Sequence, residues 1–396
     1  MAKKAYIGVN GVARKIKKGY IGVNTLARKI KKVYIGVGGV ARPCWSGGEL
    51  VYWGVIDKGV IVGNSSGRCM HGAETIGDYA IFAGGEIPSG QTNNTTIYNS
   101  SLTKTSATFL GEARYNIGTA TTNNHAIFYT GYTNKSSTMG TYSVDAYDSA
   151  LTHSYPTQSN SRLHETAGAS INGYALFAGG RGGSTAARIV YSYDSSLTYM
   201  GRDSLTETAT LLAATTVEGY ALFGGGLRSV SAGVSANVWA YNGSITRSEP
   251  TALSLARYEL AATTVGDYAL FAGGMDDNNT TTGQTVGTVD AYNASLTRIT
   301  ATSLSVPRYS LAATSLGEYA IFAGGFRNGA TGSQNVGYLA LVDVYDTSLT
   351  RTTSTNLGVG RSYLAATSVG KYALFAGGDD GTSLRNDDID VYTIAS

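Results

Sequence analysis

Short alternating segments run through most of the chain, and seven of them share a pattern of apolar residues followed by glycine. Each begins with Tyr or His, continues with Ala and two large apolar residues, and ends in Gly. The copies are YAIFAGG (79–85), HAIFYTG (125–131), YALFAGG (174–180), YALFGGG (220–226), YALFAGG (268–274), YAIFAGG (319–325) and YALFAGG (372–378). They start 46 to 53 residues apart, a period typical of β-propeller blades.

Each repeat is predicted to form four strands, which we call A to D. Strand A is a segment such as LAATT, strand B is the glycine-ended segment, strand C is a segment such as VDAYD, and strand D follows a short polar turn. The last repeat stops after strand C, so we expect the segment at 49–68 to supply its outer strand and close the ring. The sequence therefore predicts an all-β, seven-bladed propeller over residues 47–396.

Residues 1–46 follow a different pattern, with three repeats of 14 residues: AYIGVNGVARKIKK (5–18), GYIGVNTLARKIKK (19–32) and VYIGVGGVARPCWS (33–46). Two alternating stretches joined by a two-residue turn predict a β-hairpin in each, with Val9 facing Val12 and Ile7 facing Arg14. So small a meander buries little apolar surface alone, so we expect it to contact its own copies or a larger assembly. The residues predicted to anchor this arm are Ile7, Val9, Val12, Arg14, Ile21, Val23, Arg28, Ile35, Val37 and Arg42.

Charge separates the two parts of the chain. Residues 1–46 hold 11 Lys and Arg and no acid, whereas the remaining 350 residues hold 19 Lys and Arg against 27 Asp and Glu. A basic arm on an acidic body suggests a docking segment, although the same charges could simply protect strand edges from aggregation. Specific nucleic-acid binding is not expected, because no aromatic platform for bases accompanies the charge.

Composition narrows the class of protein further. Charged residues make up only 14% of the chain and glycine is abundant, which excludes a coiled coil or a charged disordered chain. No apolar run is long enough to cross a membrane, and the N-terminus is not a signal peptide. Two cysteines do not make a disulfide framework, so synthesis in a reducing cytoplasm is expected.

The repeats resemble the kelch family over residues 49–396. The resemblance rests on the glycine pairs, the tyrosine that follows them in strand C, and an arginine that opens strand A; the family's later tryptophan is not repeated here. The arginines are Arg68, Arg114, Arg162, Arg257, Arg308 and Arg361, and Ala209 interrupts the series. Their recurrence in blade after blade favours a structural role.

The arm resembles N-terminal repeats of virion structural proteins from tailed phages of Gram-positive gut bacteria. This resemblance implies that residues 1–46 anchor the protein to a virion and that the propeller is displayed outward.

The connections between strands B and C vary most from repeat to repeat, and in a propeller they emerge on one face together with the D–A connections. Rigid scaffolds that carry variable loops are typical of binding proteins, although such loops can also be merely tolerated. Their Asn, Thr, Ser and Gly residues suit polar partners such as glycans or protein loops. The candidate ligand-binding residues are Tyr132, Lys135, Arg181, Arg188, Arg228, Asp276, Asp277, Arg327, Asp379 and Asp380.

Catalytic and metal chemistry is not indicated. The chain's histidines are His71, His125, His153 and His164, and no two fall at metal-ligand spacing, so each is expected to be a satisfied or an exposed side chain. We predict no metal site, no cofactor and no enzyme, while the Asp-rich loops at Asp276 and Asp379 leave calcium binding open. A pair of carboxylates with perturbed pKa values in the propeller mouth would favour an enzyme instead.

The expected function is that of a phage virion protein, made in the host cytoplasm, whose arm contacts other virion proteins and whose propeller binds a host-surface glycan or protein. A homo-oligomer is expected. Two alternatives remain, a capsid or tail decoration without host binding and an enzyme that acts on carbohydrate.

Overall fold

The structure is a computed structural model that describes residues 6–9, 12–15, 20–23, 26–29, 32–37, 40–46, 48–56, 67–133, 140–157, 159, 161–229, 233–276, 284–329, 336–383 and 385–395. The chain divides into two compact units, one of 1–51 with 393–396 and one of 52–392. Strands are the regular secondary structure of the described residues in both units. No helix among those residues is long and apolar enough to cross a membrane.

The N-terminal unit contains three β-hairpins, one for each 14-residue repeat. In the first, Val9 pairs with Val12 and Ile7 with Arg14, so the predicted register is confirmed. The second hairpin repeats that register, and the third is longer. The strands are β1 (Tyr6–Val9), β2 (Val12–Lys15), β3 (Tyr20–Val23), β4 (Leu26–Lys29), β5 (Lys32–Val37) and β6 (Val40–Ser46).

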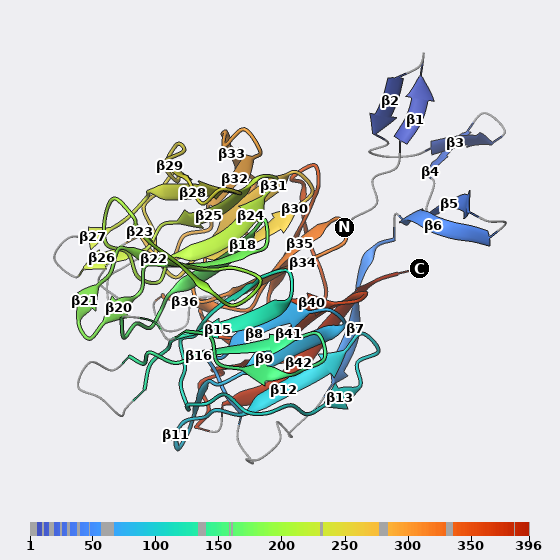
Figure 1. Cartoon of the computed structure of the whole chain (residues 1–396). Helices are drawn as coiled ribbons and strands as arrows, with labels where there is room; N and C mark the ends of the chain where they lie inside the picture. Colours follow the sequence, from blue (N-terminus) through green and yellow to red (C-terminus); the bar gives the residue numbers. More distant parts are fainter. Residues whose placement is uncertain are drawn as a thin grey trace. The chain divides into compact units, whose positions relative to one another are not determined.

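Seven four-stranded antiparallel sheets form a seven-bladed propeller, as predicted (Figure 1). The first three blades are β8 (Gly72–Ile76), β9 (Tyr79–Ala83), β12 (Thr95–Asn99) and β13 (Lys104–Thr105); β14 (Gly118–Thr121), β15 (His125–Tyr129), β16 (Val144–Asp148) and β17 (His153–Ser154); and β18 (Ala167–Ile171), β19 (Tyr174–Ala178), β22 (Ile189–Tyr193) and β23 (Tyr199–Ser204).

The next three blades repeat this order. They are β24 (Ala213–Val217), β25 (Tyr220–Gly224), β28 (Val238–Asn242) and β29 (Arg247–Ser248); β30 (Ala261–Val265), β31 (Tyr268–Ala272), β32 (Val289–Asn293) and β33 (Arg298–Ala301); and β34 (Ala312–Leu316), β35 (Tyr319–Ala323), β38 (Val342–Asp346) and β39 (Arg351–Thr353).

The seventh blade closes the ring by combining both ends of the propeller sequence. Its strands run in the order β40 (Ala365–Val369), β41 (Tyr372–Gly378), β42 (Asn386–Ile394) and β7 (Leu50–Ile56). The Tyr52 hydroxyl donates a 2.8 Å hydrogen bond from β7 to Asp390 of β42. The prediction that the segment at 49–68 supplies the missing outer strand is therefore confirmed for its first half, and positions 57–66 lie outside the described residues.

The innermost strands contact one another in sequence order, and β40 contacts β8 to complete the circle. Apolar residues fill the spaces between adjacent blades; Leu270 of blade five, for example, packs with Phe322 and Tyr345 of blade six. Four small hairpins extend the B–C connections within the part of the chain that the structure describes. They are β10 (Glu86–Ile87) with β11 (Gly90–Gln91), β20 (Arg181–Gly182) with β21 (Thr185–Ala186), β26 (Leu227–Ser229) with β27 (Gly233–Val234), and β36 (Phe326–Arg327) with β37 (Gly337–Tyr338).

The glycine pairs are explained by close approach between blades. Gly273 and Gly274 have φ angles of +72° and +109°. A Cβ on Gly273 would lie 2.5 Å from the carbonyl oxygen of Arg308 in the next blade. Glycine is therefore required where strand B ends against the neighbouring strand A.

Candidate functional site: a pocket at the centre of the propeller

A cavity of about 240 Å³ opens where the seven A strands begin, and every blade contributes two consecutive residues to its wall. The first residue of each pair forms what we call the first ring: Met70, Asn116, Glu165, Leu211, Glu259, Ser310 and Tyr363. The second residues form the second ring: His71, Ile117, Thr166, Leu212, Leu260, Leu311 and Leu364.

Backbone geometry fixes the first ring. All seven of its residues are non-glycine, and all have φ between +51° and +60°. This left-handed conformation costs on the order of 1–3 kcal/mol for each residue and persists only where the surroundings hold it. Hydrogen bonds between neighbouring blades provide that support: Met70 N–H donates to the Tyr363 carbonyl at 2.9 Å and Asn116 N–H to the Met70 carbonyl at 2.8 Å. Equivalent bonds join Glu165 to Asn116, Glu259 to Leu211, Ser310 to Glu259 and Tyr363 to Ser310.

The second ring is mainly aliphatic. Five of its seven members are Leu or Ile, and their side chains lie against the first glycine of the strand B doublet in the preceding blade. The two exceptions are His71 and Thr166, which are 6% and 8% exposed. The pocket therefore combines an apolar wall with a few polar groups, as small-molecule sites do.

Glu165 is an ionised carboxylate of the first ring. Its oxygens lie 3.1 Å from Nε of Arg181 and 3.4 Å from Nδ1 of His164, and the Thr210 hydroxyl donates to it at 2.7 Å. Burial alone would raise the pKa of Glu165, but the interactions with His164 and Arg181 outweigh it and hold that pKa below its usual value.

The pKa of Glu259, in blade five, is shifted in the opposite direction. Burial raises the pKa of its carboxyl group, hydrogen bonds from Ser310 and Tyr363 offset part of the rise, and the charge of Glu165 adds to it. The Tyr363 hydroxyl donates to Glu259 at 3.2 Å, and the Ser310 hydroxyl also donates to it. The pocket thus holds two carboxyl groups whose environments move their pKa values apart.

The predicted variable face surrounds this pocket. In every blade the residue before the first ring forms an antiparallel bridge with the residue that follows strand B, for example Tyr258 with Met275. The D–A and B–C connections therefore meet on one face, as expected. Partly buried aromatic rings stand there, and the ring centroids of Tyr115 and Tyr132 are 4.7 Å apart.

Some of the predicted ligand-binding residues lie at or next to these bridges, and others do not. Tyr132, Arg181 and Asp379 are bridge residues, and Arg228, Asp276 and Arg327 come one position later. Arg181 is the one for which a contact with a pocket carboxylate is found, through Glu165. Arg188 is exposed on the connection between β21 and β22, and Lys135 and Asp277 lie outside the described residues.

The aspartates of the predicted calcium loops have partners within the chain. Asp379 forms an ion pair of 2.8 Å with Arg385, Asp380 accepts the Thr382 N–H at 2.9 Å, and Asp276 accepts the Gln284 N–H at 3.1 Å. Among the described residues no group of three or more His, Cys, Asp and Glu is placed to hold a metal ion.

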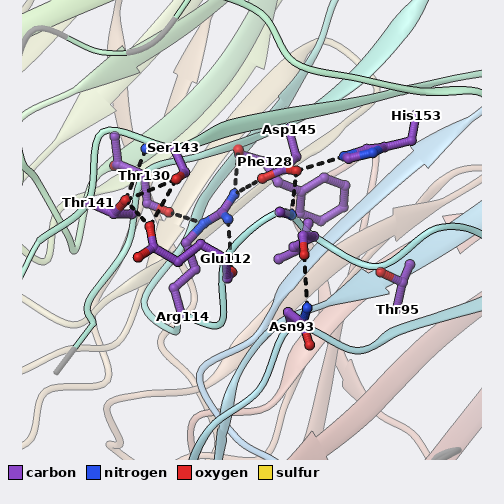
Figure 2. A network of polar contacts seen from close by, with 12 residues as sticks. Asn93, Thr95, Glu112, Arg114, Phe128, Thr130, Thr141, Ser143, Asp145 and His153 are labelled. Carbon is purple, nitrogen blue, oxygen red and sulfur yellow. Dashed lines mark hydrogen bonds and ion pairs between the residues drawn. The ribbon is translucent and has the colours of Figure 1, made fainter. Parts of the chain in front are cut away.

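The repeated arginines have the predicted structural role. Arg114 is fully buried, donates to the carbonyl oxygens of Phe128 and Thr130, and forms a 2.6 Å ion pair with Asp145 of strand C. Figure 2 shows Asp145 between this guanidinium and the imidazole of His153, which is 2.7 Å away. The same buried pair recurs as Arg257–Asp290, Arg308–Asp343 and Arg361–Asp390.

The prediction is wrong for one member of the arginine series, Arg162. In blade three the carbonyl of Leu163 accepts the N–H of Gly131, the bond that the arginine carbonyl accepts in blades such as two and five. Leu163 therefore occupies the buried arginine position, while Arg162 is partly exposed and lies 4.9 Å from the ring centre of Tyr142. In blade three the buried position therefore falls one residue after the arginine, and the local sequence pattern alone does not reveal this shift.

The sequence prediction missed the pocket residues Glu165, Glu259 and Tyr363, and it expected His71 to be a satisfied or exposed side chain. His71 is instead buried, and neither ring nitrogen has a hydrogen-bond partner in the described part of the chain. The available signal was positional, because in five blades the first-ring residue comes two positions after the buried arginine.

Comparisons with known proteins support the fold. No protein-family model matches the chain, and no curated protein matches it. A solved structure described as "Structure of YjhT", a β-propeller, is similar with a TM-score of 0.56 and 11% identity, covering 73% of this chain and 98% of that one. At that identity the likeness concerns the fold alone.

Proposed function

We propose that this chain is a phage virion protein whose hairpin arm anchors it to the particle and whose propeller binds a host-surface glycan. The observation that carries the binding role is the central pocket, to which all seven blades contribute side chains on the face with the variable loops. A kelch-type repeat would account for the arginine and glycine positions, and the basic 14-residue repeats would account for anchoring to other virion proteins.

The pocket suits a glycan because it offers both kinds of contact that a sugar ring makes. Leucine side chains of the second ring can contact C–H groups, while Asn116, Ser310 and the two glutamates can exchange hydrogen bonds with hydroxyl groups. Partly buried aromatic residues at the rim, such as Tyr115 and Tyr132, add flat apolar surfaces.

The test uses the full chain, particles that lack it, and host cells. The unaltered protein should bind both, and the triple variant Arg14→Glu/Arg28→Glu/Arg42→Glu should lose particle binding while cell binding persists. Binding to particles without binding to any host cell would instead support the decoration protein. Failure to bind particles would refute the anchoring role.

A carbohydrate-active enzyme is the second candidate, and the divergent pKa values of Glu165 and Glu259 favour it. A carboxyl group with a raised pKa in the same pocket as one with a lowered pKa is an arrangement that suits general acid–base catalysis. Release of reducing ends from host polysaccharide, lost by about a hundredfold or more in Glu259→Gln and unchanged in the exposed Glu318→Gln, would establish it. No release from any host polysaccharide would leave the binding role.

A further inference from the structure

His71 occupies a position that aliphatic side chains fill elsewhere in the second ring. Its imidazole lies against Gly377 of blade seven, just as Leu311 lies against Gly273 and Leu364 against Gly324. The surrounding ring thus shows that leucine fits this slot. The slot nevertheless holds a buried imidazole whose two nitrogens have no partner in the described part of the chain.

Such an arrangement costs stability. A buried polar group without a hydrogen bond costs about 1–3 kcal/mol relative to a satisfied one, whereas leucine has no polar group to leave unpaired. Burial, together with the nearby charges of Arg68 and Arg361, keeps the pKa of His71 well below its usual value, so the imidazole is neutral. A neutral imidazole offers one donor and one acceptor, the complement of a hydroxyl group.

The rest of the pocket limits the charge and size of the ligand. Arg181 forms an ion pair with Glu165, and the hydroxyl groups of Ser310 and Tyr363 donate to Glu259, so both carboxyl groups of the pocket already have partners within the chain. A charged ligand would have to displace one of these contacts to be matched, whereas an uncharged ligand would not. A volume of about 240 Å³ is below the roughly 300–1,000 Å³ of pockets for drug-sized ligands, which leaves room for one ring.

We propose that the central pocket binds a single uncharged sugar ring, with a hydroxyl group paired to the imidazole of His71 and the C–H face against the second-ring leucines. This inference deepens the proposed glycan-binding function and rests on it. It places recognition at one terminal sugar unit that enters the pocket and assigns a lesser part to the surrounding loops.

The test measures binding of free monosaccharides to the full-length protein by saturation-transfer NMR. The probes are glucose, galactose, mannose and N-acetylglucosamine, with glucuronate and glucosamine as charged counterparts. At least one neutral sugar should bind, and its charged counterpart should bind about tenfold more weakly or worse. His71→Leu should lose about tenfold in affinity, the value of one hydrogen bond, while its melting temperature stays equal or rises. His71→Gln, which keeps a donor and an acceptor, should retain part of the affinity.

Glu318→Gln is the matched control, because Glu318 is exposed on the turn between β34 and β35 and does not line the pocket. It should bind the sugar as the unaltered protein does. Unchanged binding in His71→Leu, or a preference for the charged sugars, would overturn the inference. If host glycans bind but no monosaccharide does, the inference fails and the proposed function stands. If a monosaccharide binds through His71 but the protein binds no host cell, the host-attachment role fails and the pocket assignment stands.

Discussion

The hydroxyl of Tyr363 in blade seven donates a hydrogen bond of 3.2 Å to the carboxyl group of Glu259 in blade five. The bond passes across blade six, whose Ser310 also donates to Glu259. Three blades therefore share one carboxyl group at the mouth of the pocket. Since both donors stabilise the ionised form, they keep the pKa of Glu259 from rising further.

Tyr363→Phe should accordingly raise the pKa of Glu259, because it removes one of the two donors without removing the ring. Titration of the labelled side-chain carboxyl carbon by NMR measures this pKa directly. Tyr309→Phe is the control, because the Tyr309 hydroxyl donates to Asn328 and not to Glu259. A pKa that falls, or an equal rise in both variants, would contradict the assignment.

Asp343→Ala should destabilise the propeller by about 3–5 kcal/mol, because it leaves Arg308 buried without its carboxylate. Denaturation by urea measures the loss of unfolding free energy.

Blade four lacks the buried Arg–Asp pair and fills the same space with apolar residues. Ala209 occupies the arginine position, and a buried Trp239, whose indole N–H donates to Thr206, occupies the aspartate position. The double variant Arg308→Ala/Asp343→Trp should therefore be more stable than Asp343→Ala, with Ser305 available to accept the indole N–H.

Glu74, a half-buried residue of the inner strand β8, should make stability depend on pH near neutrality. Burial raises its pKa to about 7 from an ordinary value of 4.5, despite hydrogen bonds from Thr75 and Thr119. Between these values the folded state holds a proton that the unfolded state releases, so the free energy of unfolding falls as pH rises from about 4.5 to 7.

A shift of that size corresponds to about 3 kcal/mol lost across the window. Glu74→Gln should remove this part of the pH dependence and should be more stable than the unaltered protein at pH 8. Thermal or urea unfolding at a series of pH values measures it. The exposed Glu318→Gln should leave the slope unchanged, and an unchanged slope in Glu74→Gln would show that Glu74 ionises normally.

Tyr52→Phe should weaken closure of the ring. Its hydroxyl donates at 2.8 Å to Asp390, which also pairs with Arg361, so the carboxylate keeps one strong partner. We expect a loss of about 1–2 kcal/mol of unfolding free energy, the range for a hydrogen bond to a charged group. Hydrogen exchange at the amides of β42 should accelerate in this variant more than at those of β31; equal effects would argue against a local role.

Much of the propeller could be predicted because its signals are local and repeated. Alternating residues recur in each blade, and glycine pairs and Asx turns each recur in six of the seven. Asn293, for example, accepts the N–H groups of Ser295 and Thr297 at 3.0 Å. The partners of the buried arginines could not be predicted, because an aspartate in VDAYD matches a solvent-facing position. Only pairing with Arg308 or its equivalents shows that it is buried.

The pocket was not predicted from the sequence, for a different reason. Its residues come from seven places about 50 residues apart, and the one signal they share, a position two residues after the repeated arginine, includes Glu259 but not Glu165. These residues come together in one pocket only when the inner strands close into a circle. The left-handed backbone of the first ring adds to this, because it aims side chains into the cavity from positions that read as ordinary turns.

Backbone hydrogen bonds at six of the seven junctions between first-ring residues separate the shape of the pocket from the identity of its side chains. The left-handed positions accept residues as different as Met, Asn, Glu, Leu, Ser and Tyr without a change in φ of more than a few degrees. The seven first-ring positions can therefore be exchanged while the frame stays constant. A library built by randomising these positions would change the side chains that face the pocket while keeping its backbone frame.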